Sequence, residues 1–282
     1  MKIIRGLRVP QNPEISIIVM AVDSDPSAIS ALASIQGQNI EKILVNTGEG
    51  TLSDKIGAND FVLVEDFSKR LPGGTRNLGI KESRAKIISF LAADCLVDRD
   101  TLDKRIIAHD KGYKLVSSAL RPSSNSLFSW ASYIYVHKKR MPEFQKGKGS
   151  LFGVSYCRTV FDELGYFDEE MRVSEDTHFN NRCSHLTYLQ SKDIITYHNY
   201  PETLRASIAD ASIRAVREMR HRGRSRIKQA TSELYKSIKL CVTVALSLHS
   251  PMRARFAAIL LPILGAGAAV GCLLARDTPH TQ

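Results

Sequence analysis

Four side chains of the acid and imidazole classes stand where an apolar run ends or a helix-like segment begins. Asp94 follows the apolar run 87–91, and His198 ends another apolar run. Glu175 and Asp176 open a helix-like segment. Carboxylates and imidazoles bind divalent cations or transfer protons. Each also has a plain structural explanation: a turn at Asp94, helix-dipole stabilisation by the two acids, and a hydrogen-bonded surface histidine.

The elements that must position these side chains read as an alternating α/β fold. Short apolar runs at 15–20, 43–45, 61–64 and 87–91 are typical of buried strands, and helical or short polar segments separate them. Alternation of this kind predicts a doubly wound sheet. In such sheets ligands bind beyond the carboxyl ends of the strands, which is where Asp94 is expected.

Further along the chain, a helix is expected over 98–111 and strands over 115–120, 151–155 and 194–198. The segment 121–149 is rich in Ser, Pro, Lys and aromatic residues and is expected to be a long loop. It either forms an acceptor-side wall that orders over substrate or is a solvated insertion.

Several motifs in this order resemble the family 2 glycosyltransferases. Arg76-Asn77-x-Gly79, a strand and then Ala92-Ala93-Asp94 are similar to the donor-site core of that family, G-x-x-R-N-x-G followed by Asp-x-Asp. Ala92 stands where the family has its first Asp, so only the second carboxylate, Asp94, is present.

The second half of the chain carries two more such elements. Glu175-Asp176 with Arg182 resembles the family's E-D-x-x-x-x-x-R element, whose Asp is the catalytic base. The run from His198 to Thr203 resembles its H-x-x-P-x-T/S element, whose His helps to hold metal. The resemblance covers about residues 13 to 205.

This resemblance implies a GT-A-like, doubly wound mixed sheet that transfers a sugar from a nucleotide-diphospho-sugar to an acceptor hydroxyl with inversion. It implies Asp176 as the base supported by Glu175, and Mg²⁺ or Mn²⁺ held by Asp94 and His198. The expected donor contacts are Ala21, Asp23, Asn46, Glu49, Arg76, Asn77, Ala92 and Ala93. Two alternatives remain: a non-catalytic nucleotide-binding or scaffolding subunit of a polysaccharide assembly complex, and a nucleotidyltransferase, which calls for a glycine-rich loop after the first strand.

Composition narrows the partners. The formal net charge of +10 over 282 residues favours an anionic partner: a nucleotide sugar, nucleic acid or an anionic membrane surface. Nucleic acid is disfavoured because the basic stretch 204–228 has no interleaved aromatic residues. The five cysteines form no C-x-x-C pair, which indicates neither a zinc site nor a disulfide framework. The first residues lack the apolar core of a secretory signal.

The C-terminal part is predicted to bind a membrane. We expect a glycosyltransferase domain over 1–205, a basic amphipathic helix over 206–232 and an apolar membrane-associated segment over 233–282. Residues 256–275 are just long enough to cross a bilayer, although a re-entrant helix or a buried core helix would also fit. Arg253 and Arg255 place the start of this segment on the cytoplasmic side. A lipid-linked glycan acceptor at that face is therefore expected.

Overall fold

The computed structural model describes residues 1–53, 60–145 and 151–275, and these fall into two compact units. The sheet unit comprises Met1–Leu120 and Gln145–His198, and the helical unit comprises Arg121–Phe144 and Asn199–Gln282. The division does not follow a single cut at residue 205, because the segment after Leu120 leaves the sheet unit and the chain returns to it at Gln145.

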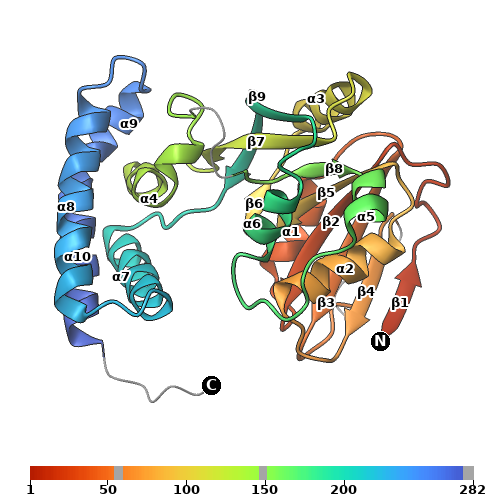
Figure 1. Cartoon of the computed structure of the whole chain (residues 1–282), viewed down its shortest axis with the longest axis horizontal. Coiled ribbons are helices and arrows are strands. Elements are labelled where there is room, and N and C mark those ends of the chain that lie inside the picture. The colour runs from red at the N-terminus through yellow and green to blue at the C-terminus, as the bar shows by residue number, and fades with distance from the viewer. Residues whose placement is uncertain (54–59, 146–150, 276–282) are drawn as a thin grey trace. The chain divides into compact units, whose positions relative to one another are not determined.

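The sheet unit is built on one mixed sheet with nine strands among the described residues, in the order β1-β4-β3-β2-β5-β8-β7-β9-β6 (Figure 1). Strands β4, β3, β2 and β5 run parallel, whereas β8 is antiparallel to both β5 and β7. The strand bounds are β1 Lys2–Arg5, β2 Ile15–Val22, β3 Ile40–Thr47, β4 Val62–Asp66, β5 Ile87–Ala92, β6 Cys95–Leu96, β7 Leu115–Pro122, β8 Ser155–Cys157 and β9 Tyr188–His198.

Helices cover both faces of this sheet. Leu78 of α2, Phe161 of α5 and Phe179 of α6 belong to one apolar core, together with Ile18 of β2. Leu32 of α1 and Leu102 of α3 belong to the core on the other face. Successive β2 side chains alternate between the two cores, as expected for a strand buried on both sides. The helix bounds are α1 Ser27–Ser34, α2 Pro72–Glu82, α3 Arg99–Asp110, α5 Thr159–Leu164 and α6 Glu175–Arg182.

The structure confirms most of the predicted elements and corrects one of the strands. The four apolar runs fall on β2 to β5, and Asp98 caps α3 by accepting a hydrogen bond from Thr101 N at 2.7 Å. The strand expected over 151–155 begins only at Ser155. The left-handed conformation of Gly153 (φ +52°) interrupts it, and Phe152 N bonds to the Ser117 hydroxyl instead.

The helical unit contains α4 Leu127–His137, α7 Leu204–His221, α8 Arg226–Ala245, α9 Met252–Ala257 and α10 Leu261–Leu274, with short 3₁₀ turns at Lys138–Arg140 and Ala258–Leu260. The long loop expected over 121–149 is wrong for α4, which buries Trp130, Tyr133 and Ile134. Ser126 caps this helix through a bond from Phe128 N. Residues 146–150 of that stretch lie outside the described residues.

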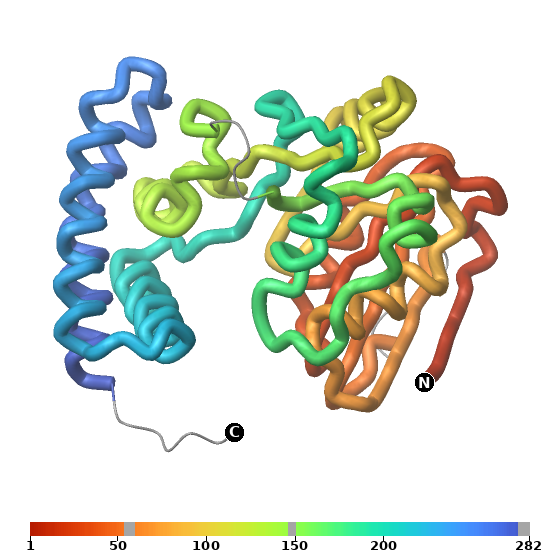
Figure 2. Tube along the Cα trace, in the orientation of Figure 1, coloured from red at the N-terminus to blue at the C-terminus, as the bar shows by residue number. Residues whose placement is uncertain are grey.

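The basic stretch 206–232 does not form one helix. Gly223, with φ +57°, ends α7, and Ser225 caps the start of α8 by accepting a bond from Lys228 N at 3.4 Å. The trace in Figure 2 shows this turn between the two helices. The apolar stripe of α7, including Ala211, Ala215 and Met219, is buried within the helical unit.

Candidate active site

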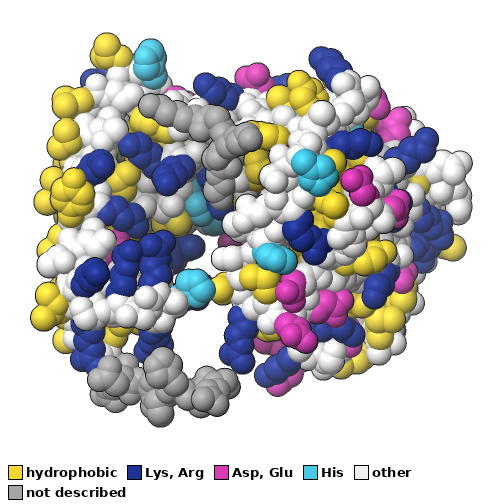
Figure 3. Space-filling view, in the orientation of Figure 1, with side chains coloured by type: hydrophobic (Ala, Val, Ile, Leu, Met, Phe, Trp, Pro, Cys, Tyr) yellow, Lys and Arg dark blue, Asp and Glu magenta, His cyan; other side chains and the backbone are white. Residues whose placement is uncertain are grey.

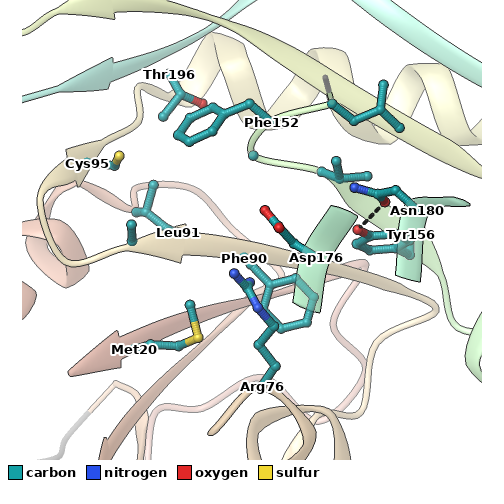
Figure 4. A pocket seen from close by; sticks show the side chains of 14 residues that line it. Met20, Arg76, Phe90, Leu91, Cys95, Phe152, Tyr156, Asp176, Asn180 and Thr196 are labelled. Atoms are coloured by element: carbon teal, nitrogen blue, oxygen red, sulfur yellow. Dashed lines mark hydrogen bonds between the residues drawn. The ribbon is translucent and has the colours of Figure 1, made fainter. Parts of the chain in front are cut away.

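A small cavity of about 70 Å³ lies in the sheet unit at the carboxyl ends of β2 and β5 (Figure 4). Its walls come from β2, α2, β5, β6, the segment before β8, β8 itself, α6 and β9. The lining residues are Met20, Arg76, Phe90, Leu91, Ala92, Cys95, Leu151, Phe152, Gly153, Val154, Tyr156, Asp176, Asn180 and Thr196. This is the edge where α/β sheets bind ligands.

Asp176 is the acidic residue that lines this cavity, and Figure 4 shows its carboxylate directed into it. Its Oδ1 accepts bonds from Thr177 N at 2.6 Å and from the Thr177 hydroxyl at 3.3 Å. The neighbouring Tyr156 hydroxyl donates to Asn180 Oδ1 at 2.8 Å. Ser174, which precedes the helix, is left-handed (φ 64°), and its side chain forms no capping bond. The Asp176 carboxylate therefore lies where it can accept a proton from a group in the cavity.

Glu175 holds an arginine in place beside the cavity. It is buried, and its Oε1 accepts a bond from Arg76 Nε at 3.2 Å. The guanidinium lies 4.9 Å from the centre of the Phe90 ring and 5.4 Å from that of Phe167. An ion pair and two ring faces therefore fix one positive charge at the cavity wall, next to Asp176.

Asp94, in the β5–β6 connection, lies beside His198, the last residue of β9. Cys95 and His198 are paired in the β6–β9 ladder, so the sheet register sets the distance of 3.3 Å between His198 Nε2 and Asp94 Oδ2. The donor atoms of Asp94, Cys95 and His198 all lie within 4.8 Å of one another.

Two of these three side chains suit a divalent cation. A carboxylate and an imidazole suit Mn²⁺ or Mg²⁺, whereas the Cys95 thiol is a soft ligand that neither ion favours. Asp94 is 52% exposed and His198 only 8%. The exposed side of the carboxylate leaves room for phosphate oxygens and water as further ligands.

Two predicted donor contacts of the R-N-x-G motif have different positions. Arg76 lines the cavity, but Asn77 is buried behind it and both ends of its amide are used. Asn77 Nδ2 donates to Phe167 O and to Glu169 Oε1 at 2.9 Å each, and its Oδ1 accepts from Phe167 N at 3.1 Å. A Cβ on Gly79 would lie 2.4 Å from Ile18 Cγ2. The motif therefore docks α2 onto β2 and onto the segment that carries Phe167.

Four other predicted donor contacts gather at the ends of β2 and β3, and none of these four residues lines the cavity. Ala21 is buried and pairs with Asn46, whose Oδ1 accepts from Ser24 N at 3.0 Å. Asp23 has φ 51°, and its Oδ1 accepts from Glu49 N at 2.7 Å. Asp23 and Glu49 are exposed, so their carboxylates are open to solvent. Asn46 is buried, and its amide stabilises the loop.

Of the two alanines before Asp94, only Ala92 lines the cavity. Both alanines pack against the apolar core that includes Leu91. A methyl group thus occupies the cavity wall at the position where the resemblance places a first carboxylate.

Sequence reasoning missed the aromatic rings beside Arg76 and the arginine buried below Gly153. Phe90 lies in the apolar run of β5, and Phe167 stands between Tyr166 and Asp168, so neither position signals a contact with Arg76. Arg105 is fully buried below Gly153, donates to Val116 O and to the Ser155 hydroxyl at 3.2 Å each, and forms no ion pair among the described residues. Desolvation lowers the pKa of Arg105 to about 10. No spacing in the sequence signals this charge.

His109 lies beside Arg105 and is also buried. Its Nδ1 is 2.8 Å from Tyr113 O, so Nδ1 carries the proton, and Nε2 accepts from the Ser155 hydroxyl at 2.9 Å. Desolvation lowers the pKa of His109 to about 4, and the nearby Arg105 charge adds to this. His109 is therefore neutral at pH 7.

Two solved structures illustrate what this chain is similar to. The mannosyltransferase PcManGT from Pyrobaculum calidifontis, in complex with GDP-Man and Mn²⁺, matches with a TM-score of 0.53 and 16% identity, over 97% of this chain and 79% of that one. TarS 1–349 from S. aureus, in complex with UDP-GlcNAc, matches with a TM-score of 0.49 and 14% identity, over 92% and 89%. No curated protein sequence matches the chain.

The family model of glycosyl transferase family 2 matches residues 16–164, which is more than half of the 282-residue chain. The matched region begins in β2 and ends with α5, so it includes Arg76, Ala92 and Asp94. The chain belongs to glycosyl transferase family 2 and is a nucleotide-sugar glycosyltransferase with the GT-A fold.

Proposed function

We propose that the sheet unit transfers a sugar from a nucleotide-diphospho-sugar to an acceptor hydroxyl with inversion, and that Asp176 is the base. The observation that carries this proposal is the position of Asp176. Its carboxylate points into a cavity at the carboxyl ends of β2 and β5, beside the fixed charge of Arg76. Positioned acids and cations at this edge are the parts that group transfer needs.

The chemical step needs one base and a stabilised leaving group. The acceptor oxygen forms a bond to the anomeric carbon while the bond from that carbon to the phosphate oxygen breaks. Its electron pair leaves with the nucleoside diphosphate, and the acceptor proton goes to Asp176. Attack and departure on opposite sides of the carbon give inversion. Arg76, held by Glu175 at 3.2 Å, supplies a positive charge that needs no rearrangement during the step.

Asp94 and His198 are the residues that would hold Mg²⁺ or Mn²⁺. When bound, the cation neutralises the negative charge that develops on the departing diphosphate. Its other ligands would be phosphate oxygens and water, because the chain offers one exposed carboxylate and one imidazole here. The structure of PcManGT with GDP-Man and Mn²⁺ makes that pair a natural first probe.

The proposal for the acceptor is based on the helical unit. Met252–Leu274 is the one helical stretch among the described residues that is long and apolar enough to cross a membrane, and an 18-residue window within it has a mean hydropathy of 2.3. Together with the basic stretch before it, this segment supports an enzyme held at the cytoplasmic face of a membrane, where a lipid-linked glycan is the acceptor.

A second function is favoured by one observation. Ala92 places a methyl group in the cavity wall, and a metal site in which Asp94 is the single carboxylate would suit a nucleotide-binding subunit that does not transfer sugar. Such a subunit would bind nucleotide sugars and leave them intact.

The test compares Asp94→Asn with Asp103→Asn. Asp103 is a matched control, because its side chain is 55% exposed against 52% for Asp94 and it lies on α3 outside the cavity lining. Binding of GDP-Man and UDP-GlcNAc is measured by calorimetry with and without Mn²⁺, and hydrolysis is followed by release of the nucleoside diphosphate. We expect at least one donor to bind in a Mn²⁺-dependent way.

Asp94→Asn should weaken that binding by about ten-fold or more, as for loss of a metal ligand. Asp103→Asn should bind like the wild type. Unchanged binding and hydrolysis in Asp94→Asn would contradict the metal assignment. Tight binding with no hydrolysis or transfer across a panel of acceptors would instead support the non-catalytic subunit.

A further inference from the structure

Helices α8 and α10 form an antiparallel hairpin inside the helical unit. Near the connection, Arg255 Nε donates to Ala245 O at 3.1 Å. Farther along, Gly265 faces Ser237, and a Cβ on this glycine would lie 2.1 Å from the Ser237 hydroxyl oxygen. Residues later in α10 therefore meet residues earlier in α8, as in an αα-hairpin.

The exposed large apolar side chains of the second arm of this hairpin lie along one stripe. From the start of α9 to the end of α10 they recur every three or four residues, with the exposed Ala266 inside the one longer step. They are Met252, Phe256, Ile259, Ile263, Val270, Leu273 and Leu274, and Ile259 is 66% exposed. Among the described residues of this arm, the exposed charged side chain is that of Arg253, which lies about 60° beyond the stripe at about 100° per residue and donates to Asn125 O at 2.7 Å.

The inward side of the same arm consists largely of small residues. Ala257, Ala258 and Ala268 are fully buried. A Cβ on Gly267 would lie 2.6 Å from Ile208 of α7, and one on Gly271 would lie 2.7 Å from Ser212 Cβ. Small residues inside and large apolar residues outside reverse the arrangement of a water-soluble helix, and they match the packing of helices in lipid.

Helix α8 adds a second apolar surface. At about 100° per residue, Ile227, Leu234, Ile238 and Val242 fall within an arc of about 80°. All four are exposed, and the exposed polar side chain within the arc is that of Thr231, whose hydroxyl donates to Ile227 O at 3.0 Å. Lys228 and Lys239, also exposed, follow about 40° to 60° beyond that arc and form its basic edge.

The two apolar surfaces lie on the same side of the hairpin. Ser237 of α8 and Gly265 of α10 mark the sides on which the two helices touch. On a helical wheel of either helix, one reaches the exposed arc by turning from that contact residue in the direction of increasing angle. Because the helices are antiparallel, these two rotations are mirror images when seen along one axis. The arcs therefore meet on one side, and we call them together the outer face. Figure 3 shows apolar side chains along the outer edge of α8.

We propose that the outer face lies in the plane of an anionic bilayer surface and that Met252–Leu274 does not cross it. The inference rests on the membrane association in the proposed function and differs from the spanning, re-entrant and buried core helices that fit the sequence. Packed as it is, α10 would carry α7 and α8 across with it. The exposed Arg205, Arg217 and Arg220 of α7 cannot enter hydrocarbon at an acceptable free energy.

An in-plane position satisfies both the apolar and the basic residues. The large side chains of the outer face enter the boundary between headgroups and acyl chains, while Lys228 and Lys239 at its edge meet lipid phosphates. Anionic lipid is therefore the occupant that the charge of this edge favours over a neutral surface.

The binding test uses the full-length protein and sedimentation with vesicles of phosphatidylcholine, either alone or with one-third phosphatidylglycerol. Ile259→Gln is compared with Ile213→Gln. Ile213 is a matched control because it is 59% exposed against 66% for Ile259 but lies on α7. We expect binding to the anionic vesicles, weakened about ten-fold by Ile259→Gln and by less than two-fold by Ile213→Gln. No vesicle binding, equal effects of the two variants, or a dimer in solution that protects Ile259 would overturn the proposal.

The depth test separates lying in the plane from crossing. Tryptophan is placed singly at Phe256, Ile263 and Leu273 in a Trp130→Phe background, since Trp130 is the only native tryptophan. Lipids brominated near the headgroup or near the chain end quench its fluorescence. We expect equal quenching at all three sites, strongest with the shallow bromines. Deep quenching at Ile263 with shallow quenching at both ends would show a spanning helix. Donor hydrolysis, measured in parallel, tests the proposed function separately, because these variants lie outside the sheet unit.

Discussion

The sheet unit and the helical unit use glycine in the same way but place their large apolar side chains on opposite sides. Gly79 lets α2 lie against Ile18 of β2, and Gly265 lets α10 lie against Ser237 of α8. In the sheet unit the interior is filled by isoleucine, valine and phenylalanine. In the α8–α10 hairpin the interior is largely small and the large apolar residues face outward.

This difference suits the two units to different tasks. A core of large side chains gives the sheet unit a rigid edge on which Arg76, Asp94 and Asp176 are positioned. Exposed apolar surfaces are typical of sites that bind a partner or a membrane, which is the role we propose for the helical unit. Changes in one unit should therefore affect turnover, changes in the other should affect membrane binding, and each variant below is measured for both.

The largest effect is expected for Asp176→Asn. The amide keeps the size of the carboxylate but cannot accept the acceptor proton, so turnover should fall by about 10²-fold or more. Donor affinity and vesicle binding should not change. Steady-state kinetics with the donor identified by binding and a hydroxyl acceptor give the measurement. Asp162→Asn, an exposed acid of α5, is the control. Loss of donor binding in Asp176→Asn would move Asp176 into the nucleotide site.

Overpacking should destabilise each unit separately. In Gly79→Ala the new Cβ would lie 2.4 Å from Ile18 Cγ2, and in Gly265→Ala it would lie 2.1 Å from the Ser237 hydroxyl oxygen. Each is expected to lower the free energy of unfolding by about 1–3 kcal/mol. Trp130, in α4, reports the helical unit, and hydrogen exchange of β2 peptides reports the sheet unit.

Gly265→Ala should shift the urea transition of Trp130 fluorescence, whereas Gly79→Ala should speed exchange in β2. If either variant changed both probes equally, the two units would not unfold independently and the comparison would fail.

A smaller loss is expected for Arg76→Lys. Lysine keeps the charge but loses the flat guanidinium that stacks on Phe90 and Phe167 and pairs with Glu175. We expect kcat/KM for the donor to fall by about ten-fold, which corresponds to about 1.4 kcal/mol. Arg84→Lys, on the connection after α2, serves as the control. Wild-type kinetics for Arg76→Lys would mean that Arg76 only joins α2 to α6.

The smallest effect concerns pH and the sheet unit. Burial lowers the pKa of His109 from 6.5 to about 4, so the unfolded chain binds a proton that the folded protein does not. Its contribution to stability is present above pH 6.5 and is lost as the pH falls toward 4. Between pH 6.5 and 5.5 this group should lower the free energy of unfolding by about 1 kcal/mol. Urea unfolding of the wild type and of His109→Asn at both pH values measures it, and an identical pH dependence would refute it.

Much of the sheet unit was predictable because its signals are local. Continuous apolar runs identified β2 to β5, and the acid after the β5 run identified the edge of the site. His198 was likewise visible at the end of a strand. What the sequence does not show is the strand pairing that joins them. The β6–β9 register places His198 Nε2 3.3 Å from Asp94 Oδ2, although more than one hundred residues separate the two along the chain.

Other features were not predictable for a physical reason. Asn77 reads as a ligand-binding side chain, but its amide is consumed by Phe167 and Glu169, which only the folded structure brings near. The helix α4 mixes aromatic residues with serine, so its pattern resembles a loop until tertiary packing buries Trp130 and Tyr133. An apolar segment has the same composition whether it crosses a membrane, lies in its surface or fills a core. The helices packed against Met252–Leu274 are what distinguish these positions, and the sequence alone does not show them.

The most direct test of the account is the stereochemistry of the transfer. Once a donor is identified, the product of the wild-type reaction is followed by proton NMR at the anomeric carbon. A single displacement with Asp176 as base predicts that the first product formed has the anomeric configuration opposite to that of the donor. A product that retains the donor configuration would contradict the proposed mechanism.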